Sequence, residues 1–191
     1  MVQGDMPPKP RYSRDAVLDA ALDVTRRDGL AAVSARSVAK ELQSSTAPVS
    51  SYFGSMEELI GSLVESIIDM LNASVDEAEG HDALLDGSFA MVRFCAREPR
   101  LYEALFLTTH TITPDWVAFR RRFSRGLGRS SRYASLSARA RDAIAWRASV
   151  VTHGICIEVW SRRWTKTKDA QLRRLVDELV EPVVAAHLSA P

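Results

Sequence analysis

The chain has 191 residues, of which 46% are hydrophobic and 26% are charged, and its formal net charge at pH 7 is +1. This composition is typical of a globular protein, built as one domain or as a small domain joined to a larger one. No apolar run approaches the roughly 18 residues that a membrane-spanning helix requires, and no signal peptide is visible at the start, so we expect a soluble, cytoplasmic protein.

Charge and cysteine content indicate how the chain could bind nucleic acid or a metal. Residues 1–58 carry 7 Lys and Arg side chains against 8 Asp and Glu side chains, so any contact with nucleic acid would depend on positive charge gathered locally. Cys95 and Cys156 lie inside apolar helical patterns without metal-ligand spacing. We interpret them as core residues in a reducing compartment, and we predict neither a metal site nor a cofactor.

The helical period recurs in every sizeable segment, and no convincing run alternates polar and apolar residues, so we predict an all-α fold. Residues 1–10 are rich in proline and lack this period, which predicts a flexible arm. A first helix is expected from a Ser13 N-cap to Gly29, and its apolar face consists of Val17, Ala20, Ala21 and Val24.

Three more helices follow in the N-terminal third of the chain. We expect the second from Ser34 to about Gln43 and the third, a short one, over about 45–53. The fourth begins at Ser55, where Glu58 completes the S-x-x-E pattern of a capping box.

The second and third of these helices have the spacing of a helix-turn-helix. Ala39 permits a close crossing, Val38 and Leu42 face the core, and Val49 returns from the third helix to meet them. In such a unit the later helix lies in the major groove of DNA and presents its first residues to the base edges.

Longer apolar-periodic segments make up the rest of the chain and predict a larger helical bundle. They cover about 83–97, 99–108, 115–129, 137–163 and 168–188. Pro99 and Pro114 stand where helices would begin, a position that tolerates proline. Pro182 falls inside the last segment, where we expect it to kink or interrupt the helix.

At this point the sequence resembles the TetR family of transcriptional regulators. "VLDAALDVTRRDGLAAVSARSVAKEL" is similar to the first two helices of the family. "TAPVSSYFGSMEELI" resembles its recognition helix, its Tyr-Phe pair and the start of its fourth helix. The resemblance covers roughly residues 11–65, and "EPRLYEALFL" and "VVTHGICIEVW" are more loosely similar to the ligand-binding domains of the family.

The resemblance implies a repressor that binds a near-palindromic double-stranded DNA operator as a homodimer and that a small-molecule effector releases. It implies a helix-turn-helix DNA-binding domain over residues 11–57 and a ligand-binding and dimerisation domain over residues 58–191. The last two long segments, about 137–163 and 168–188, would form the dimer interface as a four-helix bundle. The operator, the effector and the regulated genes cannot be predicted from the sequence.

The residues that the resemblance assigns to DNA lie on the second and third helices and just after them. Arg36 would reach a base edge and Tyr52 would hold a phosphate. The full set of expected DNA contacts is Arg36, Thr46, Ala47, Pro48, Ser50, Ser51, Tyr52 and Ser55. Lys9, Arg11 and Arg14 could add contacts from the arm.

Four positions depart from the family pattern. Gln43 replaces the usual glycine of the turn, where a left-handed backbone would cost about 1 kcal/mol. Ser44 replaces an apolar residue, Ser50 a phosphate-binding tyrosine, and Met56 a lysine. These departures leave open a helical dimeric sensor or interaction protein with a degenerate DNA-binding module.

Other features fit either a functional or a purely structural role. Six arginines at 120, 121, 122, 125, 129 and 132 form either an anion-binding patch or a solvated face paired with acids elsewhere. Gly154, in the middle of a helix beside His153, predicts close packing against a neighbour, such as a second subunit. For the effector pocket we select Phe94, Phe106, Trp116 and Trp146.

An enzyme is the alternative from a different class. The sequence has no glycine-rich phosphate loop, no G-x-S-x-G elbow and no H-E-x-x-H motif, and its four histidines are scattered. We therefore predict that the chain is not an enzyme.

Overall fold

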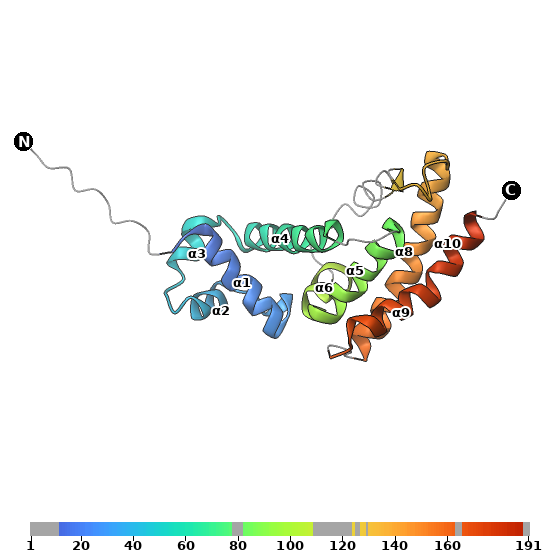
Figure 1. Ribbon diagram of the computed structural model, residues 1–191. Helices are drawn as coiled ribbons and strands as arrows, with labels where there is room; N and C mark the ends of the chain where they lie inside the picture. Colours follow the sequence, from blue (N-terminus) through green and yellow to red (C-terminus); the bar gives the residue numbers. More distant parts are fainter. Residues whose placement is uncertain are drawn as a thin grey trace, which may run out of the picture. The chain divides into compact units, whose positions relative to one another are not determined.

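The computed structural model describes residues 12–77, 82–108, 124, 127–128, 130–162 and 166–188, and over these residues every regular element is a helix (Figure 1). This confirms the predicted all-α fold. The elements are α1 (Arg14–Asp28), a short 3-10 helix (Leu30–Ala32), α2 (Ala35–Glu41), α3 (Ala47–Tyr52), α4 (Met56–Asp76), α5 (Ala83–Arg97), α6 (Pro99–Phe106), α8 (Ala138–Ser161), α9 (Asp169–Leu179) and α10 (Glu181–Leu188). The arm, Pro114 and most of the helix expected over 115–129 lie outside the described residues.

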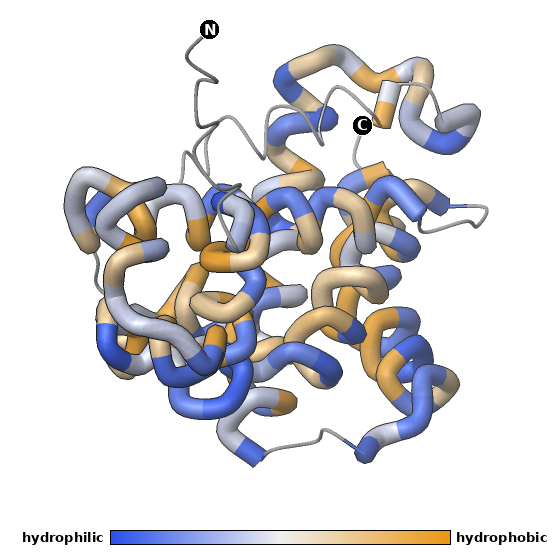
Figure 2. Tube along the Cα trace, turned by 90° about the vertical axis from the view of Figure 1, so that its left-hand side faces the viewer, coloured by the Kyte–Doolittle hydropathy of each residue, from blue (hydrophilic) through white to orange (hydrophobic). Residues whose placement is uncertain are grey.

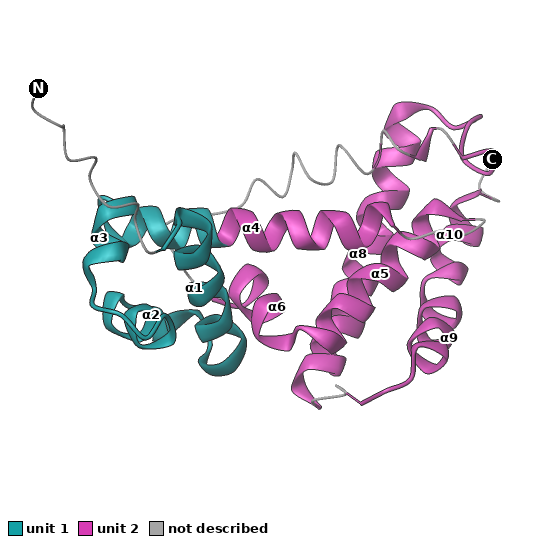
Figure 3. Ribbon diagram, turned by 60° about the vertical axis from the view of Figure 1, so that its left-hand side comes forward, with its two compact units in different colours: residues 1–63 teal, residues 64–191 magenta. Residues whose placement is uncertain are grey.

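The chain divides into two compact units, residues 1–63 and residues 64–191 (Figure 3). The division falls inside α4, between Leu63 and Val64. Hydrophilic and hydrophobic residues alternate in short stretches along the trace, as expected for helices with one buried side (Figure 2). No helix in the described parts of the chain is both long and apolar enough to cross a membrane.

In the N-terminal unit, α1 has the ends that its sequence predicts. The Ser13 side chain accepts a hydrogen bond from the Ala16 N–H, and Gly29, with φ 90°, ends the helix and donates its N–H to Thr25 O over 2.9 Å. The predicted apolar face is buried and consists of Val17, Ala20, Ala21 and Val24. This face packs against α2 and α3, so α1 supports the helix-turn-helix.

The C-terminal unit is built around α5, which packs against α6, α8 and α9. Helix α10 lies along α8 and α9 (Figure 1). Both cysteines are fully buried where α5 meets α8, and the Cys95 thiol donates to Cys156 O over 3.3 Å. Burial raises the pKa of the Cys156 thiol. The prediction that the cysteines are core residues is confirmed.

Prolines shape two of the helix boundaries. Pro99 occupies the first turn of α6, as predicted. The segment expected over 168–188 is interrupted between Leu179 and Glu181, directly before Pro182, and continues as α10. Proline has no N–H to donate and its ring crowds the preceding turn, so the interruption follows the prediction.

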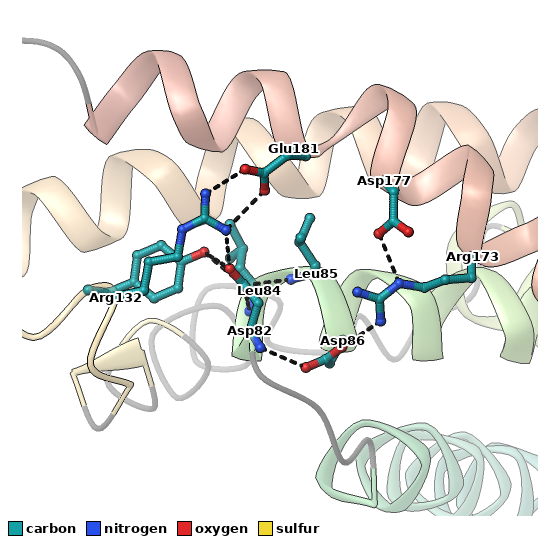
Figure 4. Close-up of polar contacts among 9 residues, drawn as sticks. Asp82, Leu84, Leu85, Asp86, Arg132, Arg173, Asp177 and Glu181 are labelled. Atoms are coloured by element: carbon teal, nitrogen blue, oxygen red, sulfur yellow. Dashed lines mark hydrogen bonds and ion pairs between the residues drawn. The ribbon is translucent and has the colours of Figure 1, made fainter.

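A buried carboxylate joins the start of α5 to residues distant in sequence (Figure 4). Asp82 caps α5 by accepting hydrogen bonds from the N–H groups of Leu84 and Leu85, over 2.9 and 3.1 Å. The Tyr133 hydroxyl donates to it over 2.8 Å, and Arg132 forms an ion pair with it. Burial alone would raise the pKa of Asp82, but these hydrogen bonds and the charge of Arg132 outweigh burial, so the pKa is lowered.

Two arginines extend this network to the last two helices (Figure 4). Arg132 also pairs with Glu181 of α10 over 2.6 Å. Arg173 of α9 pairs with the buried Asp86 of α5 over 2.5 Å and with Asp177 over 2.9 Å. Within the predicted arginine run, Arg132 is thus a structural residue paired with acids, and the other five arginines lie where no side chain is described.

Candidate nucleic-acid interface

The turn between α2 and α3 contains a left-handed residue that is not glycine. Gln43 has φ 50°, as its place in the turn predicts. Its N–H donates to Lys40 O over 3.1 Å, and the Ser44 N–H donates to Ala39 O over 2.9 Å. These two bonds form a Schellman motif, which ends α2 and turns the chain towards α3. The motif requires a left-handed residue. Because glutamine has a Cβ atom, this backbone conformation at Gln43 carries the expected strain.

Two tyrosines tie the turn and the following helix to the residues before α1. The Tyr12 hydroxyl donates to Leu42 O over 2.9 Å, at the end of α2. The Tyr52 hydroxyl, at the end of α3, donates to Tyr12 O over 2.7 Å. Sequence reasoning missed Tyr12, because a contact over 40 residues has no local pattern.

Helix α3 buries one side and exposes a face of small and hydroxyl side chains. Val49 and the following Phe53 are buried against the core, whereas Thr46, Ala47, Ser50 and Ser51 are exposed. Pro48, in the first turn, is partly buried. The residues expected to line the groove therefore share one exposed surface.

The hydroxyl groups on this face are bonded to their own helix. Ser50 Oγ and Ser51 Oγ both donate to Ala47 O, over 3.1 and 2.8 Å. A serine hydroxyl that bonds to a helix carbonyl does so in place of an outside partner. Rotation about its Cα–Cβ bond can therefore redirect the hydroxyl to such a partner. Thr46 makes no capping bond to α3.

Three of the five cations described in the N-terminal unit are engaged within it, and one of them, Arg26, pairs with Asp23 over 3.6 Å. Arg14 donates to Ser62 Oγ over 2.8 Å and lies 4.7 Å from the ring centre of Phe53. Arg27 pairs with Asp28 and Glu41 over 2.9 and 2.7 Å.

Two cations on α2 are exposed and, unlike those just described, are not engaged in this way among the described residues. Arg36 and Lys40 are exposed, and within the described part of the chain neither has an ion pair. They stand four residues apart, and therefore on the same side of the helix. Sequence reasoning selected Arg36 and missed Lys40, although this spacing was available to find it.

The start of α4 confirms half of the predicted capping box. The Ser55 side chain accepts from the Glu58 N–H over 3.2 Å. The Glu58 carboxylate accepts from the Gly54 N–H over 2.8 Å, one residue before the N-cap that a reciprocal box would use. Ser55 is exposed beside α3, and Met56 is half-buried at the first position of α4.

The sequence model of the family described as "Bacterial regulatory proteins, tetR family" matches residues 17–63, which include α1, α2, α3 and the start of α4. Over these residues the chain matches the tetR family. It is a TetR-type transcriptional regulator. No curated protein sequence matches the chain.

Solved structures similar to this TetR-type chain share its fold at low identity. A transcriptional regulator from Rhodococcus sp. Rha1 has a TM-score of 0.67 and 18% identity, over 94% of this chain and 100% of that one. A candidate transcriptional regulator from Pseudomonas aeruginosa PAO1 has a TM-score of 0.64 and 15% identity, over 93% and 95%. The fatty acid degradation regulator FadR from Bacillus halodurans has a TM-score of 0.55 and 17% identity, over 94% and 100%.

The four residues that we selected for an effector pocket lie in the C-terminal unit of this TetR-type regulator, and the three that the structure describes differ in their burial and contacts. Phe94 is buried in α5, Trp146 is 54% exposed on α8, and Trp116 lies outside the described residues. Phe106 packs against Tyr102 and His153, with ring centres 4.8 and 4.7 Å away. Sequence reasoning did not assign Tyr102 or His153 to the pocket.

His153 and Tyr102 are also joined by a hydrogen bond. The Tyr102 oxygen lies 3.1 Å from His153 Nδ1. Burial lowers the pKa of His153 and raises the pKa of Tyr102, so both side chains are neutral at pH 7. Within the described residues, no group of His, Cys, Asp and Glu side chains has the arrangement of a metal site.

Proposed function

We propose that this TetR-type regulator is a cytoplasmic repressor that binds a near-palindromic DNA operator as a homodimer and that a small-molecule effector releases. Residues 11–57 would bind DNA, and residues 58–191 would bind the effector and dimerise. In this proposal the effector favours a dimer geometry in which the two copies of α3 no longer match successive major grooves, roughly 34 Å apart.

The observation that carries the proposal is the exposed face of α3, together with the two exposed cations of α2, which have no ion pair among the described residues. Short side chains allow the helix backbone to come close to base edges, and the two cations provide local positive charge in a unit whose Asp and Glu side chains outnumber its Lys and Arg side chains. Ser50 and Ser51 would donate to phosphates or bases after rotation, and Ala47 and Pro48 would contact thymine methyl groups.

Arg36 is the proposed base contact, and Lys40 and Tyr52 would contact phosphates. Arginine donates two parallel hydrogen bonds to guanine, whereas lysine acts as a point charge. In the structure the Tyr52 proton is donated to Tyr12 O, so a phosphate contact requires Tyr52 to exchange that bond. Thr46 and Ser55 complete the surface from the two ends of α3.

For the effector we propose a site beside Phe106, Tyr102 and His153. These three side chains combine aromatic surface with one polar pair, the composition of a site for a largely apolar molecule. Phe94, Trp116 and Trp146 remain proposed lining residues.

For dimerisation we propose the exposed sides of α8 and α9. Large apolar side chains are exposed there, among them Val150 and Ile157 on α8 and Leu179 on α9. Exposed apolar surface of this kind is typical of protein interfaces.

The first experiment is selection of bound sequences from a random duplex library by the purified protein, followed by titration of the best sequence at several salt concentrations. A palindromic motif bound by two chains with a steep salt dependence supports the proposal. If a folded dimer enriches no sequence, the alternative of a sensor or interaction protein with a degenerate DNA-binding module is favoured.

Arg36→Ala tests the proposed base contact. Loss of a bidentate contact should weaken binding to the selected operator by about 1–3 kcal/mol and relax the preference at one base pair. Arg174→Ala, an exposed arginine of α9, is the control and should bind as the unmodified protein does. Competition titrations with single-base operator variants measure both effects, and unchanged specificity would remove Arg36 from the base-reading set.

A further inference from the structure

Tyr12, the residue directly before the N-cap of α1, is bonded to the ends of both helices of the helix-turn-helix. Its hydroxyl donates to Leu42 O over 2.9 Å, and its carbonyl accepts from the Tyr52 hydroxyl over 2.7 Å. Leu42 is the C-cap of α2, and Tyr52 is the last residue of α3. One residue outside the helix-turn-helix therefore joins the C-terminal ends of its two helices.

The bond to Leu42 satisfies a carbonyl group at the end of α2. The last carbonyl groups of a helix have no N–H donor within the helix and need partners from elsewhere. The Schellman motif of the turn supplies backbone donors for two of the carbonyls that precede Leu42. Leu42 O accepts from the partly buried Tyr12 side chain instead, so a contact across 30 residues completes the cap from which the chain turns into α3.

Helix α3 has few contacts of its own that fix its direction. It contains six residues, and its N-cap, Thr46, forms no side-chain bond to it. A helix of this length is not stable alone in water, so its position depends on contacts with the rest of the unit. Its apolar contacts come from the buried side chains of Val49 and of Phe53, which directly follows it. Among the described residues, the Tyr52 hydroxyl makes the only hydrogen bond from α3 to a distant part of the chain.

The same stretch of chain also contacts the residue that follows α3. Arg14, two residues after Tyr12, lies 4.7 Å from the ring centre of Phe53 and donates to Ser62 Oγ of α4 over 2.8 Å. The start of α1 is therefore in contact with the residues on both sides of the recognition helix, at the end of α2 and at the end of α3.

We propose that Tyr12 is a positioning residue for DNA recognition, which sets the direction of α3 through its bonds to Leu42 and Tyr52. The inference rests on the DNA binding of the proposed function and adds to it a residue that acts through others. A binding surface has to be held within about 0.5 Å of its working geometry. The turn contributes less to this than a glycine turn would, because Gln43 is strained, and the bond from Tyr12 holds the turn from outside.

Tyr12→Phe tests the proposal, because it removes the hydroxyl and keeps the ring and the carbonyl that accepts from Tyr52. Loss of this hydrogen bond should weaken binding to the selected operator about tenfold. Binding to an unrelated duplex should change by less than about twofold, since it depends on the cations of α2. The ratio of the two affinities, measured by competition titration, should therefore fall nearly tenfold.

A residue that only stabilised the fold would leave this ratio unchanged, because a lower folded fraction weakens binding to every duplex equally. Circular dichroism at the working temperature measures the folded fraction of each variant. Tyr133→Phe is the matched control, since it removes a tyrosine hydroxyl from another bond between distant residues, in the C-terminal unit. It should keep the operator preference of the unmodified protein.

Hydrogen exchange of the full chain without DNA tests the hold on α3 by itself. In Tyr12→Phe the amide groups of residues 43–53 should exchange about tenfold faster, whereas those of α1 should keep their rates, because the opening is local. In Tyr133→Phe neither segment should change. Mass spectrometry of peptides from the two segments measures both rates in one sample.

The outcomes separate the role of Tyr12 from the proposed function. An unmodified protein that enriches no operator overturns DNA recognition and, with it, the positioning role. An operator that Tyr12→Phe binds with full preference overturns the role of Tyr12 and leaves the proposed function standing. Exchange that is unchanged over residues 43–53, or that rises equally in α1, also overturns the role of Tyr12 alone.

Discussion

At the scale of single residues, Gln43 ends α2 in a conformation that favours glycine. The bond of its N–H to Lys40 O and the bond of the Ser44 N–H to Ala39 O are those of a Schellman motif, and its φ of 50° crowds the Cβ atom. Replacement by glycine should relieve this crowding and raise the free energy of unfolding by about 1 kcal/mol. Urea unfolding at pH 7 measures the difference.

Gln43→Ala is the matched control, since alanine keeps the Cβ atom. It should show no gain, because the crowding comes from the first side-chain carbon. Equal stabilisation by glycine and alanine would contradict this account and indicate a cost that arises beyond that carbon.

Asp82 gives the C-terminal unit a dependence on pH. Its pKa is lowered in the folded state, so its contribution to stability is complete above the unfolded-state value of about 3.9 and is lost as the pH falls below that value. Asp82→Asn should cost about 2 kcal/mol at pH 7 through weakened bonds to Arg132 and Tyr133. The difference from the unmodified protein should shrink towards pH 3.

Unfolding by urea at pH 7, 5 and 3 provides the comparison for Asp82→Asn. Asp69→Asn is the control, because Asp69 is exposed on α4 and should contribute little at any of these values. A difference that stays constant with pH would show that the ionised form of Asp82 is not what stabilises the fold.

At the scale of elements, helix ends and the helix-turn-helix were predictable because their signals are local. Ser13, Gly29 and Pro99 act within one turn of their own position, and Val38, Ala39 and Val49 are buried at the spacing of a helix-turn-helix. Glu58 departs from its predicted bond by one residue, because the chain before the cap brings the Gly54 N–H within reach.

The contacts that sequence reasoning missed join distant parts of the chain. Tyr52 and Tyr12 are 40 residues apart, and Tyr133 and Asp82 are 51 residues apart. Such pairs depend on how the helices pack, and a single sequence carries no period that reveals them. Sequence reasoning therefore identified Arg132 only as one member of an arginine run and could not predict which acids it pairs with.

The start of α4 allows a test of its approach to DNA. Met56→Lys adds a cation at the first position of the helix, beside the exposed Ser55. If this end of α4 faces a phosphate, operator binding should tighten and the slope of log K against log salt should steepen by about one unit. Met56→Gln is the uncharged control, and an unchanged slope for the lysine variant would place α4 away from the DNA backbone.

At the scale of the whole molecule, dimerisation should couple to folding. A protein that folds as a homodimer is stabilised by mass action, so its Tm rises with protein concentration. We expect this rise for the unmodified chain. Calorimetry over a hundredfold range of concentration measures the effect, and a Tm independent of concentration in the unmodified protein would contradict the homodimer.

The exposed face of α3 carries short side chains, and their length limits how far the helix could move from DNA before its contacts are lost. A long arginine side chain can follow a base as a helix moves away, but serine, threonine and alanine have almost no reach of their own. Recognition by such short side chains therefore tolerates little displacement of the helix from the groove. If α3 reads DNA as we propose, a small movement would be enough to lose the target, so a weakly discriminating effector would suffice to control the regulator.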